Sequence, residues 1–305
     1  MTTAITPSGE QTYAKPSAGS VIGGVIAGNI VASATKTPHK IFAPKIMNQL
    51  AKINDTLSAD QFTLVKDAVG NTLKQSGLDK KGVEILRATS ENVDEVAKIM
   101  TKEFNGNFMT RHLPDGIKDF LGSIMGNTVA DGKNAFYAMQ SKKVVLPDKG
   151  LALTAFHELG HAANANLSKF GKTLQKCRPL TALALPIALI ALFKTKKQEG
   201  QESKGAVDKA TTFVKNNAGK LTFAAFLPML LEEGLATAKG NAFAKKLLSP
   251  DLAKKVSKTN ALAYTTYLGL AVLSSLGIYL GVKLKDSITD KSIKKRTAAA
   301  TEANA

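Results

Sequence analysis

Cysteine and tryptophan are almost absent from this chain. Among its 305 residues there is one cysteine, Cys177, and no tryptophan. A single cysteine cannot form a disulfide within the chain, which argues against a small secreted domain held together by disulfides. Cys177 also lies outside any cluster of metal-ligand residues. We therefore interpret it as a free thiol and not as a nucleophile.

Acidic and aromatic residues are also scarce. Aspartate and glutamate number 24 against 41 lysines and arginines, which gives a formal net charge of +17, and aromatic residues make up 6%. A basic surface can bind nucleic acid, but these lysines are spread along the chain and few aromatic residues are available to stack on bases. No glycine-rich phosphate-binding loop is present either. The sequence predicts no nucleic-acid partner, and basic residues beside apolar segments favour anionic lipid headgroups instead.

Histidine is rare as well, yet two of the four histidines lie within the five residues His157-Glu158-Leu159-Gly160-His161. Helix positions four apart are about 6 Å apart along the axis and lie on one face, so both imidazoles can bind one Zn²⁺. Glu158 can accept a proton from a water molecule whose pKa the metal lowers to about 7. The motif predicts a zinc hydrolase. The alternative is a chance match in a surface helix.

Two short β-prone runs precede the motif. Residues 135–139 and 143–146 are separated by three polar residues, which predicts a β-hairpin. Asp148 then is a suitable N-cap for a helix that runs to about Phe170, with Gly171 as the residue after its end. An edge strand beside a metal site can hold an extended substrate.

The hairpin and the His-Glu-x-x-His helix together resemble the zincin metalloproteases. Gly160 matches the common form of the motif, and a residue without a side chain lets another ligand-bearing helix approach closely. A catalytic zinc normally takes a third protein ligand. The metzincin extension with a third histidine six residues on is absent, because Leu167 occupies that position. Glu232 and Glu233 are the remaining candidates.

Neighbouring helix positions differ by about 100°, so at most one of these two glutamates is expected to face the metal. Glu233 shares its helix face with three small residues: Ala236, Thr237 and Gly240. A face of small residues is the better surface for close packing on the helix of the motif. We therefore predict Glu233 as the third ligand and Glu232 as a solvated or lysine-paired neighbour. The alternative is that both form an ordinary acidic pair at a membrane or core boundary.

The residues after Glu233 resemble the gluzincin pattern, in which Ala-Asp follows the ligand glutamate after two intervening residues. Ala236 matches this pattern, but Thr237 replaces the aspartate. In the family that aspartate orients a histidine, so its replacement leaves the orientation of His157 or His161 open. The Thr237 hydroxyl and a backbone carbonyl are two candidates for the missing group.

Three apolar segments accompany the motif residues. Residues 261–282 carry no charge and have tyrosines near both ends, and they are long enough to cross a hydrocarbon core of about 30 Å. Residues 179–193 and 221–231 are shorter, and they form either a hairpin that enters the bilayer or a buried hairpin in a soluble core. A membrane hairpin between the two halves of a metal site resembles the integral-membrane gluzincins of the CAAX-processing and heat-shock protease type.

Residues 17–34 are apolar and rich in small residues. A fourth span, a surface segment and a signal peptide that ends at Ala32-Ser33-Ala34 are the alternatives, and we favour a membrane-associated segment. Between residues 44 and 131, apolar positions recur at helical spacing, which predicts a soluble, mostly helical domain. In that domain we interpret Arg111 and His112 as an exposed loop pair.

The predicted fold class is mainly α with a small β-hairpin, in which a zincin-like core is combined with transmembrane helices. Five regions are expected: an apolar, small-residue segment at 1–40; a soluble helical domain at 41–133; a zincin-like catalytic region at 134–260, with the apolar hairpin 179–193 and 221–231; a transmembrane helix at 261–285; and a basic and then disordered tail at 286–305, with the disorder from Thr297.

These observations predict a membrane-associated, zinc-dependent metallopeptidase that hydrolyses peptide bonds. Zn²⁺ is the expected cofactor, with His157, His161 and Glu233 as metal ligands and Glu158 as general base and later proton donor to the leaving amine. The expected partners are a peptide or protein substrate, membrane proteins included, and the lipid bilayer, which a multi-pass protein would cross. Tyr264 is the candidate for stabilising the oxyanion. The alternatives are a catalytically silent membrane scaffold or metal-binding protein with a zincin-like fold, and a basic membrane-surface protein.

Overall fold

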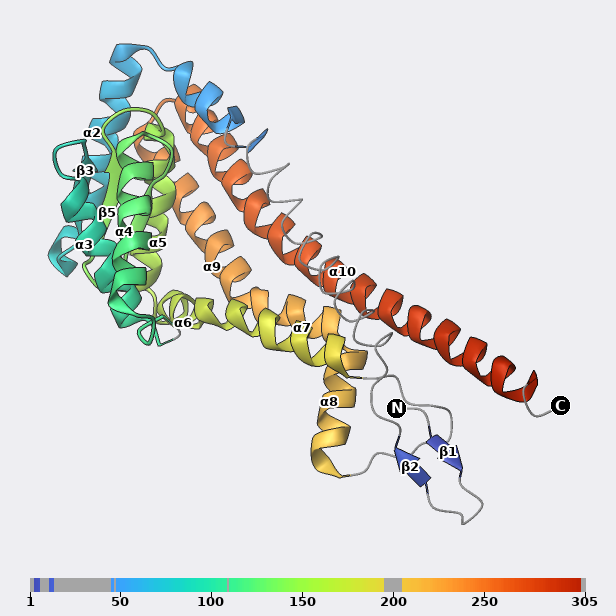
Figure 1. The fold of residues 1–305 in the computed structure, drawn as a ribbon. Helices are drawn as coiled ribbons and strands as arrows, with labels where there is room; N and C mark the ends of the chain where they lie inside the picture. Colours follow the sequence, from blue (N-terminus) through green and yellow to red (C-terminus); the bar gives the residue numbers. More distant parts are fainter. Residues whose placement is uncertain are drawn as a thin grey trace. The chain divides into compact units, whose positions relative to one another are not determined.

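A computed structural model describes residues 3–5, 11–13, 45–46, 48–108, 110–194 and 205–302. The described part of the chain is mainly helical, as expected, with one sheet of three strands and a separate antiparallel pair, β1 (Thr3–Ile5) and β2 (Gln11–Tyr13) (Figure 1). The chain divides into two compact units. The first unit comprises residues 1–40, 182–225 and 270–305, and the second comprises residues 41–181 and 226–269.

The helices are distributed over both units. Those of the second unit are α2 (Ala59–Gln75), α3 (Val93–Gly106), α4 (Asp115–Ala130), α5 (Ala155–Leu167) and α6 (Lys169–Cys177), with the short 3₁₀ helices η1 (Asp79–Lys81) and η2 (Ala152–Thr154). Those of the first unit are α7 (Ala184–Phe193) and α8 (Ala206–Asn216). The two long helices α9 (Ala218–Leu247) and α10 (Pro250–Glu302), and the 3₁₀ helix η3 (Arg178–Leu183), contribute residues to both units.

The sheet of the second unit has β5 (Lys143–Pro147) between β3 (Glu84–Ala88) and β4 (Phe136–Ala138). β4 and β5 are antiparallel, with Phe136 opposite Val145, so the predicted hairpin is confirmed. β3 runs parallel to β5 and was not predicted, since the region between 44 and 131 was expected to be mostly helical. A parallel pair joins strands that are far apart in the sequence, so no turn motif between them predicts the pairing.

Helices cover both faces of this sheet. Val144 and Leu146 of β5 point into a core that they share with α2 and α5, whereas Val145 points into a second core with α3 and α4. This alternation follows from the two-residue period of a strand. Val144 and Val145 are both fully buried, so β5 is the centre of the second unit. The sheet in turn supports α5, which lies against β4 and β5 (Figure 1).

Helix α5 is shorter than predicted at both ends. It begins at Ala155 after η2, so Asp148 is not its N-cap, and it ends at Leu167 instead of Phe170. The break occurs because Ser168 is extended and its hydroxyl accepts a hydrogen bond from the N–H of Gly171, which makes it the N-cap of α6. Gly171 is therefore not the residue after α5. A Cβ there would lie 2.9 Å from Asn164 Cα, so this glycine lets α6 pack closely on α5.

Three helical stretches are long and apolar enough to cross a membrane: Lys169–Phe193, Ala218–Leu247 and Pro250–Lys291. They contain the three apolar segments found in the sequence. In the first stretch only 11% of the apolar window is buried, and Leu185 and Phe193 are 66% and 77% exposed. Such exposure is costly in water and normal in lipid, so for residues 179–193 it favours the membrane alternative, whereas the apolar window of Ala218–Leu247 is 44% buried.

Apolar contacts join α7 to α10 in the first unit, and an ion pair of Lys215 Nζ with Asp286 Oδ1 at 2.8 Å joins α8 to α10. Ala191 and Leu192 pack against Ile278 and Val282, and the buried Lys285 donates a hydrogen bond from Nζ to the carbonyl oxygen of Ala191. Helix α10 continues to Glu302, so it includes the first residues of the tail that was expected to be disordered from Thr297. Residues 17–34 lie outside the described residues, so their membrane association stays a prediction.

Candidate metal centre

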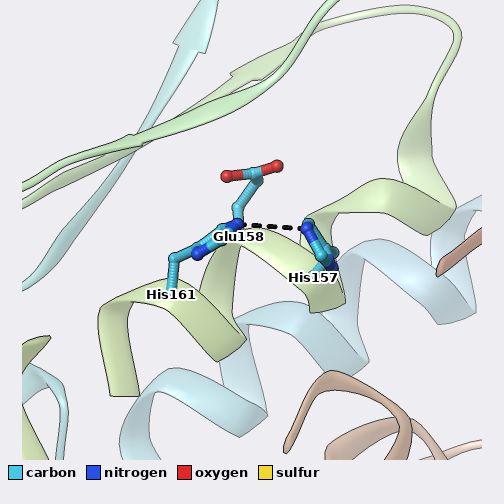
Figure 2. A group of neighbouring side chains, drawn as sticks. All are labelled: His157, Glu158 and His161. Atoms are coloured by element: carbon cyan, nitrogen blue, oxygen red, sulfur yellow. Dashed lines mark hydrogen bonds between the residues drawn. The ribbon is translucent and has the colours of Figure 1, made fainter. Parts of the chain in front are cut away.

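The two histidines of the motif face each other on consecutive turns of α5. Their Nε2 atoms are 3.0 Å apart, and their ring planes meet at 86° with the ring centroids 4.5 Å apart (Figure 2). Both side chains are buried, with 4% of His157 and 6% of His161 exposed. The spacing of four residues thus has the effect expected from the sequence, because it brings two imidazole nitrogens to one point beside the helix.

Glu233 approaches the same point from α9. Its Oε2 lies 3.0 Å from Nε2 of His157 and 3.5 Å from Nε2 of His161. The three atoms therefore form a triangle with edges of 3.0, 3.0 and 3.5 Å. Ligand atoms at about 2.0–2.1 Å from a tetrahedral zinc are about 3.3 Å apart, so this nitrogen and oxygen donor set fits zinc. The structure brings together the three residues predicted as metal ligands.

Glu158 lies beside this triangle and is not part of it. One of its carboxylate oxygens is within 4.8 Å of a ring nitrogen of each histidine, and Figure 2 shows the carboxylate pointing from α5 toward the strands. Within the described residues it makes no hydrogen bond or ion pair. Burial raises the pKa of the Glu158 carboxyl, because the charged form loses its hydration. A carboxylate with a raised pKa is a stronger base, as the predicted role requires.

Glycines let α9 approach the motif. A Cβ on Gly160 would lie 2.1 Å from the carbonyl oxygen of Ala236, and a Cβ on Gly240 would lie 2.5 Å from the carbonyl oxygen of Phe156. Each helix thus has a glycine where the backbone of the other passes. The sequence-based expectation that the small face of α9 packs on the motif helix is confirmed. This close packing is what allows the short Glu233 side chain to reach both histidines.

The prediction for Glu232 is wrong. Its side chain is fully buried, and Oε1 lies 2.9 Å from Nδ1 of His161. The same oxygen accepts hydrogen bonds from Asn164 Nδ2 and Gln175 Nε2, both at 2.9 Å. The 100° between neighbouring helix positions does separate the two glutamates, but side chains of both α5 and α6 reach the position of Glu232. A flexible glutamate at position 232 therefore still meets protein instead of water.

Arg178, which the sequence presented only as a basic flank of an apolar segment, joins the two glutamates. Its Nη1 lies 2.8 Å from Glu232 Oε2, and its Nη2 lies 2.7 Å from Glu233 Oε1. The guanidinium also lies over the ring of Tyr267, 5.9 Å from the ring centroid. The sequence contained one indication of a special role for Arg178: the chain has only four arginines, and this one stands at the start of an apolar segment.

The side chains of this network carry a net negative charge, which a bound cation would neutralise. Glu232 and Glu233 contribute two negative charges and Arg178 one positive charge, in a site where both glutamates are fully buried. Burial opposes a charge on His161, but the carboxylates of Glu232 and Glu233 outweigh it and raise the pKa of His161 to about 10. A divalent cation bound to the ring nitrogens supplies the same compensation as this proton, so the electrostatics also fit a metal.

The remaining predicted residues lie around or away from this centre. The Thr237 hydroxyl is 3.4 Å from Nδ1 of His157, which is long for a hydrogen bond. The ring of Tyr264 lies 3.8 Å from the position of a Cβ on Gly234, so it is next to the turn that carries Glu233. Arg111 donates to the ring of His112 in an exposed loop before α4, as expected, and Cys177 is a free thiol at the end of α6.

Comparison with known proteins identifies no relative of this chain. No protein-family model, curated protein or solved structure matches the chain. The resemblance to zincin metalloproteases therefore stays an expectation from the His-Glu-x-x-His motif and the residues that follow Glu233.

Proposed function

We propose that this protein is a membrane-associated zinc metallopeptidase of the gluzincin type, with a core similar to that of the zincins. The observation that carries the proposal is the triangle of His157 Nε2, His161 Nε2 and Glu233 Oε2, with Glu158 beside it. These three residues would hold the metal, which when bound supplies Lewis acidity and an activated water molecule. Glu158 accepts the proton of the attacking water and then donates it to the leaving amine.

An edge strand that contacts the motif helix supports a peptide as substrate. Within the described residues β4 is an edge strand, because the sheet order is β3-β5-β4. Asn166 of α5 donates a hydrogen bond to the hydroxyl of Tyr137 at 2.8 Å, which ties β4 to the motif helix. The free edge of a strand offers its backbone groups to an extended chain. An extended peptide or an unfolded segment of a protein fits this arrangement.

The candidate spans support a place in the membrane. Glu233 belongs to the apolar stretch Ala218–Leu247 and Arg178 to the stretch Lys169–Phe193, so the metal centre draws its residues from two helices that are able to cross a bilayer. An integral, multi-pass protein follows if these stretches and Pro250–Lys291 all enter the membrane. The substrate would then be a membrane protein or a peptide at the membrane surface.

The first test of the proposal is zinc stoichiometry. We expect elemental analysis of the detergent-purified protein to find about one zinc per chain, and His161→Ala and Glu233→Ala to lose it, since each removes one of three ligands. His112→Ala is the matched control and keeps the zinc, because His112 lies in an exposed loop. A folded parent protein without zinc contradicts the proposal.

A second candidate function is a metal-binding membrane protein without catalysis. The observation in its favour is the burial of the motif, since His157, Glu158 and His161 are each less than a tenth exposed. A structural zinc site is closed, whereas a catalytic one keeps a position open to water and substrate. Such a protein binds zinc, but Glu158 has no catalytic role in it. Substitution of Glu158 therefore distinguishes the two functions, because only a peptidase would lose turnover.

Tyr264 stays the candidate for stabilising the oxyanion. Its ring lies beside Gly234, directly after the proposed ligand Glu233. Removing the hydroxyl in Tyr264→Phe is expected to lower kcat about 100-fold and to leave zinc binding intact, as loss of one oxyanion donor does in other hydrolases. Steady-state kinetics check this prediction. Unchanged turnover in Tyr264→Phe would remove Tyr264 from the mechanism.

A further inference from the structure

Four side-chain donors face the carboxylate of Glu232, as many as its two oxygens have lone-pair sites. Its Oε1 faces His161 Nδ1, Asn164 Nδ2 and Gln175 Nε2, each at 2.9 Å, and its Oε2 faces Arg178 Nη1 at 2.8 Å. Its backbone oxygen accepts a further bond from Asn164 at 3.2 Å. The donors come from α5, α6 and the start of η3, so three segments converge on one side chain.

Two of these donors, the side-chain amides of Asn164 and Gln175, point their N–H groups at Glu232 in an orientation that costs free energy. The side-chain oxygens of Asn164 and Gln175 are buried and find no hydrogen-bond partner within the described residues. An unpaired buried oxygen costs free energy. The two amides nevertheless direct their N–H groups at Glu232. Such an arrangement is expected where the position of the carboxylate matters.

The position matters because of the atom that Glu232 meets. A carboxylate oxygen only accepts hydrogen bonds, so Nδ1 of His161 is the donor and carries a proton. In the neutral imidazole the lone pair is then on Nε2, the atom that faces His157 and Glu233. Glu232 therefore selects the tautomer of His161 that can bind a metal, and it also sets the plane of the ring.

The other histidine has no comparable partner within the described residues. The Thr237 hydroxyl lies 3.4 Å from Nδ1 of His157, which is long for a hydrogen bond. Thr237 occupies the position at which gluzincins have the aspartate that orients a histidine. In this chain the acidic group stands on the other side of the ligand, directly before Glu233, and it acts on His161.

We propose that Glu232 is a positioning residue that fixes the tautomer and orientation of His161, and that Arg178 holds Glu232 and Glu233 in register by bridging them. The inference rests on the proposed function, since it requires that His161 and Glu233 bind zinc. Glu232, which directly precedes the ligand Glu233 in the sequence, would thus take the role of the aspartate that Thr237 replaces. Arg178, from the first apolar stretch, would hold Glu232 in place.

The test compares zinc affinity in three variants of the full-length, detergent-purified protein. Glu232→Gln removes the charge but keeps the shape of the side chain, and we expect its zinc affinity to fall about 10- to 100-fold, as is usual when the partner of a ligand histidine is replaced. Arg178→Lys keeps the charge but lacks the planar guanidinium that presents separate nitrogens to the two carboxylates, and it is expected to lower the affinity as well. Glu91→Gln, the same change at an exposed position, is the matched control and keeps the parent affinity.

Competition with a chromophoric chelator measures the affinity, and the visible spectrum of the Co²⁺-loaded protein reports the geometry of the ligands. A shifted Co²⁺ spectrum in Glu232→Gln is the signature of a displaced His161, which a merely structural role of Glu232 would not produce. If Glu232→Gln does not fold, Arg178→Lys carries the test. Parent affinity and an unchanged Co²⁺ spectrum in the variants overturn the inference.

The two proposals fail in distinguishable ways. A parent protein that binds neither zinc nor Co²⁺ contradicts the proposed function itself. A parent protein that binds zinc, with Glu232→Gln and Arg178→Lys that bind it equally well, leaves the metal site intact and removes only the positioning role.

Discussion

Replacing Glu158 by glutamine is expected to reduce peptide hydrolysis by about 100- to 10,000-fold, the range that a general base contributes. The amide cannot accept the proton of the attacking water, whereas the ligands His157, His161 and Glu233 are untouched. We therefore expect Glu158→Gln to keep about one zinc per chain. Cleavage of a peptide library by the detergent-purified protein, followed by mass spectrometry, measures turnover, and elemental analysis measures the zinc.

The control for this experiment is Glu84→Gln. Glu84 is an exposed glutamate on β3, so the same chemical change is made away from the metal centre, and turnover should equal that of the parent. Equal turnover in Glu158→Gln and the parent would contradict the proposed mechanism. A parent protein that binds zinc but cleaves no peptide would favour the metal-binding protein without catalysis, for which the burial of the motif is the supporting observation.

Replacing Gly160 by alanine is expected to disrupt the contact of α5 with α9. The added Cβ would lie 2.1 Å from the Ala236 carbonyl oxygen, whereas a carbon and an oxygen in close contact are usually at least about 3.3 Å apart. The two helices must then separate by about 1 Å. Such overpacking costs about 2–3 kcal/mol, which corresponds to a fall in Tm of roughly 5–10 °C.

The same separation acts on the metal centre. Glu233 is on α9 and both histidines are on α5, so moving the helices apart opens the triangle of ligand atoms. Gly160→Ala is thus expected to lose zinc as well as stability. Thermal unfolding in detergent and elemental analysis check both effects on one preparation.

The matched control is Gly70→Ala. Gly70 lies inside α2, and a Cβ there would meet nothing within 4 Å. Alanine is favoured over glycine in a helix by about 0.5–1 kcal/mol, so this variant should keep its zinc and unfold at the same or a higher temperature. If Gly160→Ala also behaves like the parent, α9 does not hold Glu233 against α5 in the way described.

The local pattern of the sequence determined the elements of the candidate site. His157 and His161 are one turn apart, and any helix over these residues brings their rings to one face, whatever it packs against. The small face of α9 was equally readable, because Ala236, Thr237 and Gly240 recur with the period of a helix and leave space for a second backbone. The hairpin of β4 and β5 followed from two β-prone runs with a short polar connection.

Only the tertiary structure decided which groups surround that site. Glu232, Asn164, Gln175 and Arg178 meet because α6 folds back on α5 beside α9, and no periodicity within one helix encodes that meeting. The pairing of β3 with β5 was hidden for the same reason, since it joins distant segments. Spacing along a helix or strand determines which side chains share a face, but the environment of a face depends on the element that packs against it. A glutamate such as Glu232 can be solvated or buried with the same local sequence.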